Sequence, residues 1–440
     1  MNDDVEALVG SRRDEIARES IDVSSVTWYG CSPPLQRTGI FCTTCARSVP
    51  TTRPLDCAEP QKPWLIGSGI WQSGRPPVVD AQGHVYAFAG NGWTHGCSGK
   101  TAWYADACEV GQPKPPGYYG ESLVRLDPGN GLALVGSWTP ANWCELELHD
   151  LDLGGSGPAL IDFTLAGGGP RTFAVGGGKE GHLYAIDTGA VAAPDGVEGL
   201  STRALHGNFD VVHDVPATAC AASTPTQRAQ AHHIMGGPVI WPRARADAVS
   251  VFVSEESDCV RGFALASPLT PPSQFTDLIQ RRPVTATAQV IEGHPGAILT
   301  LSADGDASGT GILWMTYALN PSGEDAVIDT RRGQLAAYDA EDLGRRLWHS
   351  DMAAGQRDAL GYFAKFNPST VANGKMYAAS FPPPEPYKTI PDDKGNPHTY
   401  TAPNNMGYVV VYGLDPPAKA PVRSFAAEAL QAILAPLLEE

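Results

Sequence analysis

Between about residue 67 and residue 415, short apolar runs alternate with turns rich in Gly, Asp, Asn and Pro. Apolar runs that are separated by such turns at short intervals predict many short antiparallel strands. Gly and Pro are abundant, at 48 and 38 residues, but the apolar runs between the turns are sizeable. The chain is therefore expected to fold around a β-rich core.

A weak internal repeat organises these predicted strands. An entry containing Gly or Pro precedes an apolar strand, a turn and a second strand, and repetition of this kind indicates a repeat architecture. Five copies lie within residues 74–92, 155–189, 236–266, 294–340 and 367–415. Radial repetition of four-stranded sheets, as in a β-propeller, is one way in which a protein hides its strand edges.

Two copies end in a further shared pattern, which consists of an Asp, a turn Gly and a Trp. The two segments are LDPGNGLALVGSW (126–138) and YDAEDLGRRLW (338–348). They predict a tight turn after a third strand and then a fourth, outer strand. The Trp at its end is expected to wedge against the neighbouring sheet and bury a large apolar area.

Several of these pieces resemble the pyrroloquinoline-quinone (PQQ) repeat, a WD40-like repeat of the bacterial quinoprotein-like propeller family. They are GNG (90–92), DLDLGGSGP (150–158), GGGKEG (176–181), HHIMGGP (232–238) and FNPSTVANGKMY (366–377). The resemblance covers roughly residues 67–415 and implies an all-β fold, a β-propeller of four-stranded antiparallel blades. Propellers of this family close with seven or eight blades, whereas five repeats are recognised here. Hidden blades, a fragment, or a small or open ring would each explain the difference.

Three regions are expected along the chain. Residues 1–66 would comprise a polar helix or frayed end over 1–24 and an irregular Cys-rich segment. Residues 67–420 would form the quinoprotein-like propeller. Residues 421–440 predict a C-terminal helical tail that covers a face or an edge of the propeller, because apolar residues recur there at helical spacing; docking to another protein is the alternative. These apolar residues are Leu430, Ile433, Leu434, Leu437 and Leu438.

The charge and hydropathy of the chain limit the kinds of partner that are expected. The formal net charge of −17 argues against free nucleic acid, since phosphate binding needs clustered Lys and Arg. No apolar run is long enough to predict a transmembrane segment. The partner would then be a protein or a small molecule.

Nine cysteines in loop-like surroundings favour an oxidising compartment. The N-terminus lacks the apolar stretch of a signal peptide. The protein is therefore expected to be periplasmic or secreted if a leader is missing from this chain, and otherwise cytoplasmic with reduced thiols. Cys97 and Cys108 bracket an insertion, which a disulfide between them would close.

The cysteines Cys31, Cys42, Cys45 and Cys57 leave two interpretations open. Four thiolates could hold a structural zinc ion, or the cysteines could pair as disulfides. Cys42 and Cys45 have C-x-x-C spacing, but Ala46 stands where a c-type haem site requires His.

The segments ahead of the first strands of the predicted blades carry the candidate site, because these segments converge on one face of a propeller. The ligand-binding candidates are Trp71, Gln72, Ser73, Lys365 and Asn367. The metal-binding candidates are His149, His232, His233 and His294. The candidates for a catalytic base are Asp150 and Asp152. Imidazole and carboxylate groups can bind a transition metal or move protons; alternatively, these residues cap strand ends and bond buried backbone groups.

Two glycine-rich or acidic segments resemble ligand loops without meeting their requirements. GGGKEG (176–181) lacks the spacing of a phosphate loop and precedes a strand, so it predicts a hairpin turn. Asp304 and Asp306 lie in a loop that lacks the twelve-residue calcium pattern, so a solvated hairpin is expected there.

Two functions fit these features. The first is a non-catalytic binding or scaffold module for a protein or a small ligand at one face of the ring. The second is an oxidoreductase that binds PQQ, with Ca²⁺, or a transition metal at the channel mouth. The resemblance implies that the dehydrogenases of the family carry an adjacent pair of cysteines, and this chain has no Cys-Cys dipeptide.

Overall fold

A computed structural model describes most of the chain between residues 68 and 414 and one short segment near the N-terminus. The described residues are 16–22, 41, 43, 68–91, 119–164, 169–191, 206–210, 232–243, 248–265, 278–280, 282–319, 326, 330–383, 385–391, 397–402 and 407–414. Apart from one α-helix, α2 (Trp143–Leu148), and short 3-10 turns, the regular structure of these residues is β-strand. The predicted all-β fold class is therefore confirmed for the described part of the chain.

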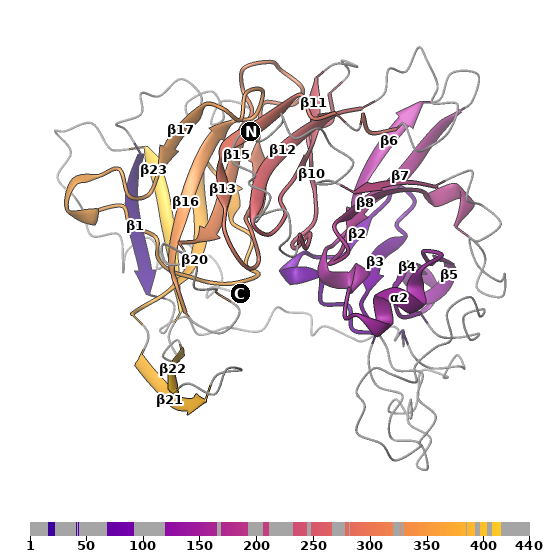
Figure 1. Ribbon diagram of the computed structural model, residues 1–440. Coiled ribbons are helices and arrows are strands. Elements are labelled where there is room, and N and C mark those ends of the chain that lie inside the picture. The colour runs from indigo at the N-terminus through magenta and orange to yellow at the C-terminus, as the bar shows by residue number, and fades with distance from the viewer. Residues whose placement is uncertain are drawn as a thin grey trace, which may run out of the picture.

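Three four-stranded antiparallel sheets follow one another along the chain (Figure 1). The first sheet contains β2 (Val78–Val79), β3 (Val85–Ala89), β4 (Ser122–Asp127) and β5 (Ala133–Trp138). The second contains β6 (Ala159–Thr164), β7 (Pro170–Gly177), β8 (His182–Asp187) and β9 (His206–Asp210). The third contains β10 (Val239–Ile240), β11 (Val249–Val253), β12 (Asp258–Ala264) and β13 (Thr285–Ile291). In each sheet the strands pair in chain order, so each sheet is a meander.

A nine-stranded sheet contains two further runs of four strands. The fourth run is β14 (Ile298–Ser302), β15 (Ile312–Ala318), β16 (Arg332–Asp339) and β17 (Arg346–His349). The fifth run is β19 (Thr370–Ala372), β20 (Lys375–Phe381), β23 (Tyr408–Leu414) and β1 (Ile16–Asp22). Strand β18 (Gly361–Phe363) pairs with the start of β16 and the end of β20 and so joins the two runs. A hairpin of β21 (Glu385–Pro391) and β22 (Pro397–Ala402) projects from one side (Figure 1).

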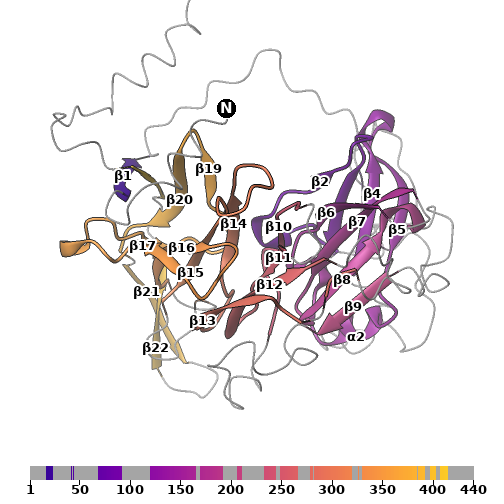
Figure 2. The same ribbon diagram turned by 90° about the horizontal axis from the view of Figure 1, so that it is seen from above.

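The central strands of the third and fourth runs are buried on both faces, because each of these runs packs against a neighbour on either side. Every residue of β12 and of β15 is buried. One apolar core joins the first sheet to the second, another joins the second to the third, and others join the third to the fourth run and the fourth to the fifth. The first strands of consecutive runs are also in contact, from β2 through β6, β10 and β14 to β19. Figure 2 shows the runs side by side in chain order.

The two predicted Trp wedges are confirmed. Trp138 ends β5 and packs edge-on against Tyr184 of the second sheet, with ring centroids 5.3 Å apart. Trp348 of β17 packs in the same way against Tyr412 of β23, also at 5.3 Å. Each Trp thus lies on the outermost strand of one run and fills the space beside the third strand of the next. Both side chains are buried, so each pair contributes apolar contact between neighbouring runs.

The prediction for residues 1–24, a polar helix or frayed end, is wrong for Ile16–Asp22. These seven residues form β1, which pairs antiparallel with the whole of β23, from Ile16 opposite Leu414 to Asp22 opposite Tyr408 (Figure 1). The local pattern carries no information about a distant strand with a free edge. Tertiary pairing therefore overrides the local preference of this segment.

Several predictions fall on residues outside the described ones. These concern Cys31, Cys42, Cys45, Cys57, Cys97 and Cys108 and the C-terminal tail over 421–440. Among the described cysteines, Cys144 and Cys259 are disulfide-bonded. In the described part of the chain, no helix has the length and apolar character needed to cross a membrane.

Deleting residues 1–23 should destabilise the fifth run, because β23 then loses the strand paired along its outer edge. We expect a lower melting temperature and concentration-dependent association, measured by differential scanning calorimetry and light scattering. The matched control removes residues 1–15 and keeps β1. Equal melting temperatures for the two truncated chains would contradict the pairing.

Replacing Trp138 by Ala should remove the packing between the first and second sheets. The expected loss is roughly 3–5 kcal/mol of unfolding free energy, as is typical of a buried Trp. Denaturant unfolding measures this loss, and Val79→Ala, at a side chain that is 59% exposed, is the control. A Trp138→Ala variant as stable as the Val79→Ala variant would show that the Trp does not hold the two sheets together.

Candidate functional site

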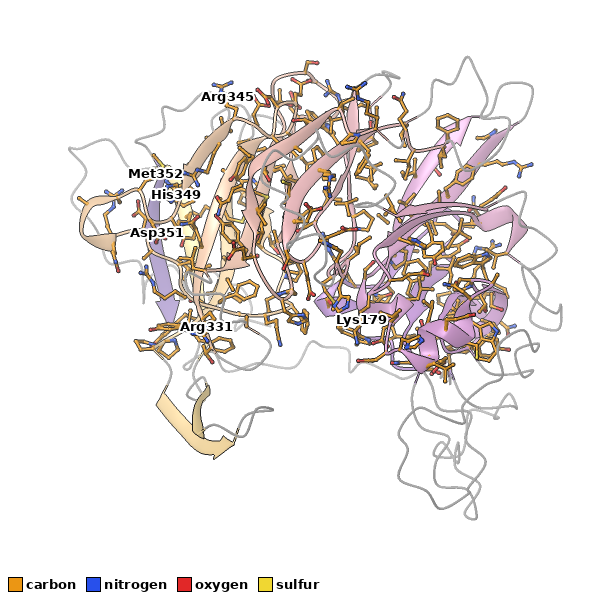
Figure 3. All side chains as sticks on the ribbon, viewed as in Figure 1. Lys179, Arg331, Arg345, His349, Asp351 and Met352 are labelled. Carbon is orange, nitrogen blue, oxygen red and sulfur yellow. The ribbon has the colours of Figure 1, made fainter. Side chains whose placement is uncertain are left out.

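A continuous series of side-chain contacts lies at one end of the first strands. The Nζ of Lys179 lies 5.8 Å from the ring centroid of Trp71, and Trp71 meets Phe366 edge-on at 5.6 Å. Phe366 in turn meets His294 edge-on at 5.5 Å, and Nδ1 of His294 contacts Oε1 of Glu256. Figure 3 shows Lys179 toward the side from which the β21–β22 hairpin projects, with Arg345 at the opposite side. We call these five residues the mouth cluster.

The first and fifth runs meet within the mouth cluster. Gly74, in the turn ahead of β2, approaches the backbone of Phe366, which lies ahead of β19. A Cβ at Gly74 would lie 1.8 Å from the carbonyl oxygen of Phe366, and its φ of +78° is also one that favours glycine. The segment ahead of β2 in the first run and the segment ahead of β19 in the fifth run are thus in van der Waals contact.

Lys179 lies between two carboxylates. Its Nζ is 2.5 Å from Oδ2 of Asp152 and 3.0 Å from Oδ1 of Asp150. The backbone N–H of Asn91 donates to Asp152 at 2.7 Å, and the side-chain amide of Asn91 donates to Asp150 at 3.0 Å. The turn that carries Lys179 joins β7 to β8, so the predicted hairpin over GGGKEG is confirmed.

The two carboxylates differ in their surroundings. Burial raises the pKa of Asp152, against the opposing attraction of Lys179. Burial also acts to raise the pKa of Asp150, but hydrogen bonds from Asn91 and Lys179 outweigh it and hold this pKa below its usual value. Asp152 is therefore the carboxylate of this pair that takes up a proton more readily.

Glu256, in the turn between β11 and β12, binds two histidines at once. Nδ1 of His233 lies 2.9 Å from Oε2 of Glu256, while His294 contacts Oε1. Burial would raise the pKa of Glu256, but the hydrogen bonds from both histidines outweigh it and lower that pKa. The glutamate is therefore ionised at neutral pH.

A second group of possible ligands lies beside the first one. His232, Glu255 and Asp258 are all buried or nearly so, with one donor atom of each within 4.8 Å of the others. His232 and Glu255 of this group are the chain neighbours of His233 and Glu256. The pair His232 and His233 thus faces the pair Glu255 and Glu256 across an antiparallel bridge.

Two further candidates from the sequence, Gln72 and Ser73, form hydrogen bonds to backbone groups. Gln72 accepts a hydrogen bond from the N–H of Phe88 at 2.8 Å, and Ser73 donates to the carbonyl of Gly155 at 2.6 Å. Both side chains are buried and bonded to backbone groups, and their role in ligand binding stays a prediction.

Lys365 and Asn367 flank Phe366. The Nζ of Lys365 lies 5.2 Å from the Phe366 ring centroid and 3.3 Å from the carbonyl oxygen of Ala326. Asn367 is exposed and donates to the carbonyl of Lys365. His149 caps the end of α2, is exposed, and belongs to neither group of possible metal ligands among the described residues.

The residues of the mouth cluster that the sequence does not single out are Lys179, Glu256 and Phe366. Lys179 and Glu256 lie in turns between the later strands of a sheet, whereas the candidates were sought ahead of first strands. The adjacent pairs His232-His233 and Glu255-Glu256 were a usable signal, since the residues face each other if their strands pair.

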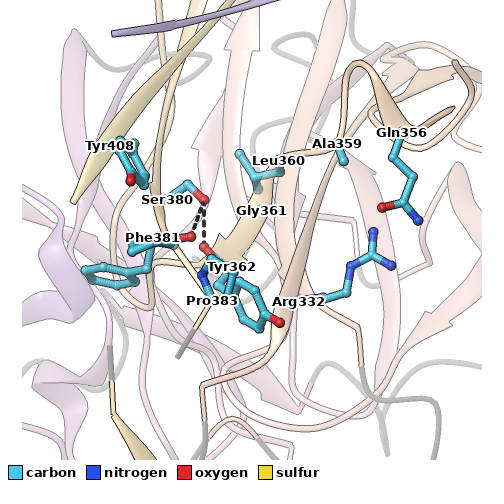
Figure 4. A pocket seen from close by; sticks show the side chains of 11 residues that line it. Arg332, Gln356, Ala359, Leu360, Gly361, Tyr362, Ser380, Phe381, Pro383 and Tyr408 are labelled. Atoms are coloured by element: carbon cyan, nitrogen blue, oxygen red, sulfur yellow. Dashed lines mark hydrogen bonds between the residues drawn. The ribbon is translucent and has the colours of Figure 1, made fainter. Parts of the chain in front are cut away.

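A separate cavity of about 600 Å³ lies where the fourth and fifth runs join (Figure 4). Its wall contains aromatic and proline side chains together with Arg332, Gln356 and Ser380. Ser380 donates its hydroxyl to the carbonyl of Tyr362 at 2.9 Å, and Arg332 lies 3.5 Å from Asp351. The Ser380 hydroxyl and the Arg332 guanidinium are thus engaged with the protein itself.

Comparison with known proteins leaves the family of this chain open. No family model matches it, and no curated protein matches its sequence. Among solved structures, it is similar to the quinohemoprotein alcohol dehydrogenase from Comamonas testosteroni, with 13% identity and a TM-score of 0.38 over 81% of this chain and 50% of that chain. The chain thus spans half the length of that protein.

A second solved structure is similar to a smaller degree. It is the C-terminal domain of PilY1 from Pseudomonas aeruginosa, with 10% identity and a TM-score of 0.29 over 76% of this chain and 86% of that chain. At TM-scores this low, neither likeness defines the activity or the ligands of the present chain.

Glu180, next to Lys179, makes a pH-dependent contribution to the stability of the folded protein. Burial would raise the pKa of Glu180, but bonds from His182, Tyr184 and Asn142 outweigh it and lower that pKa. A carboxyl whose pKa is lowered on folding stabilises the protein above its unfolded pKa, near 4.5, and this stabilisation is lost as the pH falls through the lower folded value.

A Glu180→Gln variant should therefore lose roughly 1–2 kcal/mol of unfolding free energy at pH 7. The difference from the wild type should shrink below about pH 4.5. Denaturant unfolding across pH 3–7 measures both quantities. A difference that stays constant over this range would show that Glu180 does not gain stability from its ionised form.

Proposed function

We propose that the five runs are the blades of a β-propeller and that the chain is a non-catalytic binding module whose ligand contacts the mouth cluster. The observation that carries this proposal is the contact of Trp71 and Gly74 with Phe366. It joins the first run to the fifth, while each intermediate run packs against the next. Such contacts are those expected of a closed ring, in which every sheet has a neighbour on both faces.

The chemistry of the mouth cluster favours a polar ligand with an aromatic or apolar portion. Trp71 and Phe366 offer ring surface, Lys179 offers a cation, and Glu256 offers a carboxylate. Concave sites commonly combine a few polar groups with aromatic side chains in this way. The ligand is a small molecule or an exposed loop of a protein partner.

An oxidoreductase that holds PQQ or a metal at the mouth is the alternative. The observation in its favour is the group formed by His233, Glu256 and His294, whose donor atoms suit a transition metal. The Ca²⁺ that PQQ requires fits less well. Asp150, Asp152 and Asn91 supply oxygen atoms, but the ammonium of Lys179 already lies between the two carboxylates. The absence of a Cys-Cys dipeptide also favours the binding module.

The disulfide bonds of Cys144 and Cys259 support a proposal for the compartment. Disulfides persist in oxidising surroundings, so we propose a periplasmic or secreted location.

A defined ligand panel tests the binding function. Amino acids, sugars, nucleotides, and PQQ with Ca²⁺ would each be added to the full-length protein, and the melting temperature would be recorded. We expect one class to raise it, because a ligand that binds only the folded state stabilises that state. Trp71→Ala should weaken the measured affinity about 30-fold or more, as truncation of an aromatic anchor does. Val284→Ala, at a side chain that is 48% exposed, should leave it unchanged.

Two outcomes would overturn this function. Equal affinity in the wild-type and Trp71→Ala proteins would place the ligand away from the mouth cluster. Reduction of an electron-accepting dye by the protein with added PQQ, Ca²⁺ and an alcohol would favour the oxidoreductase instead.

A further inference from the structure

Two histidines and a glutamate from neighbouring runs surround one point at the mouth. His233 precedes β10 of the third sheet, Glu256 lies in the turn between β11 and β12 of the same sheet, and His294 precedes β14 of the fourth run. One donor atom of each residue lies within 4.8 Å of the other two. Atoms bound to one ion at about 2 Å lie roughly 3–4 Å from one another. A single ion could therefore contact all three residues after small side-chain movements.

We propose that His233, Glu256 and His294 bind one divalent transition-metal ion such as Zn²⁺. Two imidazoles and one carboxylate form a donor set that suits zinc and its neighbours in the first transition row, whereas Ca²⁺ and Mg²⁺ prefer oxygen ligands alone. This inference goes beyond the proposed binding function, because the ion is held whether or not the mouth cluster binds another molecule.

The backbone holds the three ligands in place before any ion arrives. Ser257 accepts a hydrogen bond from the N–H of Gly293 at 3.2 Å, and Ser254 accepts one from the N–H of Ala297 at 2.9 Å. These bonds fasten both sides of the loop that carries His294 to the turn that carries Glu256. Ligands held in this way lose little conformational entropy when a metal binds.

Close packing adds to this arrangement. A Cβ at Gly296 would lie 2.7 Å from the carbonyl oxygen of Glu255, so only glycine lets the two loops approach so closely. The N–H of Glu256 donates to the carbonyl of His233 at 3.1 Å. The three ligands are thus positioned by main-chain contacts between two adjacent runs, and the bound ion would link these runs.

The second group, His232, Glu255 and Asp258, is a poorer candidate. Asp258 forms an ion pair with the buried Arg261. The positive charge of this guanidinium would repel a metal cation at the same carboxylate. Around Glu256 the described ion pairs are made by the two histidines themselves. A neutral imidazole can exchange its bond to a carboxylate for a bond to a metal, whereas a guanidinium cannot.

The proposed site is reachable from solvent. The side chains of His233 and His294 are 24% and 14% exposed, and that of Glu256 is 7% exposed. Three protein ligands leave at least one position of a tetrahedral ion for water or another donor. The net charge of −17 further raises the local concentration of cations.

Metal binding by the full-length protein tests this inference. The protein would be stripped with a chelator and titrated calorimetrically with Zn²⁺ alone. We expect Glu256→Gln and His233→Ala each to weaken the measured affinity more than about 100-fold, because losing a direct ligand costs more than losing one of its supporting contacts. His149→Ala is the matched control, since His149 is an exposed histidine outside both groups, and it should bind like the wild type.

Titration with Co²⁺ separates this site from cysteine ligands elsewhere in the chain. Coordination by imidazole and carboxylate gives weak visible bands, whereas thiolates add an intense charge-transfer band. The proposal predicts a wild-type spectrum without the thiolate band, and this measurement needs no variant that must fold.

The inference is overturned if both variants bind Zn²⁺ as the wild type does, if the wild type binds no Zn²⁺, or if its cobalt spectrum is that of thiolate ligands. The two proposals share Glu256 and His294, but the ligand panel is tested through Trp71, which is not a proposed metal ligand. Failure of the panel, in turn, leaves the calorimetric result standing, so the two proposals fail separately.

Discussion

Burial of both faces of the sheets in the middle of the series is the constraint on which this protein depends. A sheet that is polar on one side can end a stack, but strands such as β12 and β15, buried along their whole length, need a neighbour on each side. Five runs of four strands meet this need by packing one against the next. Wedge-like side chains, Trp138 and Trp348, fill the wider space near the outer strands. The short strands β2, β10 and β19 lie where the runs come together.

The sequence predicted those parts of the fold that are encoded locally. The Asp in the turn after a third strand is one example: Asp127 accepts a hydrogen bond from the N–H of Gly129, and the following outer strand ends on Trp138. A further copy of the turn occurs at Asp187, which accepts a hydrogen bond from the N–H of Gly189. The sequence does not reveal this copy, because no Trp follows it. Strand β1 could not be predicted, since its partner is remote and its own pattern is polar.

The candidate site was predictable to a similar degree. Position ahead of the first strands predicts Trp71, Asp152, His233 and His294. The fold brings these residues into one contiguous series with Lys179, Phe366 and Glu256. Their charged partners, Lys179 and Glu256, lie in turns between second and third strands, and antiparallel pairing in chain order brings these turns to the end at which the first strands begin. Position along the chain wrongly suggests that His149 lies with the other histidines. His149 instead caps the end of α2 and belongs to neither group of possible metal ligands.

The pairing of β1 with β23 has a consequence for how the molecule is made. Ile16–Asp22 leaves the ribosome about 400 residues before Leu414, its partner, so this contact has an extreme sequence separation. The earlier runs can fold as each emerges, but the fifth must wait for nearly the entire polypeptide. Until then the early segment has to stay available, neither buried nor paired elsewhere. Strand β1 is thus among the first parts of the chain to be synthesised and among the last to reach its place in the fold.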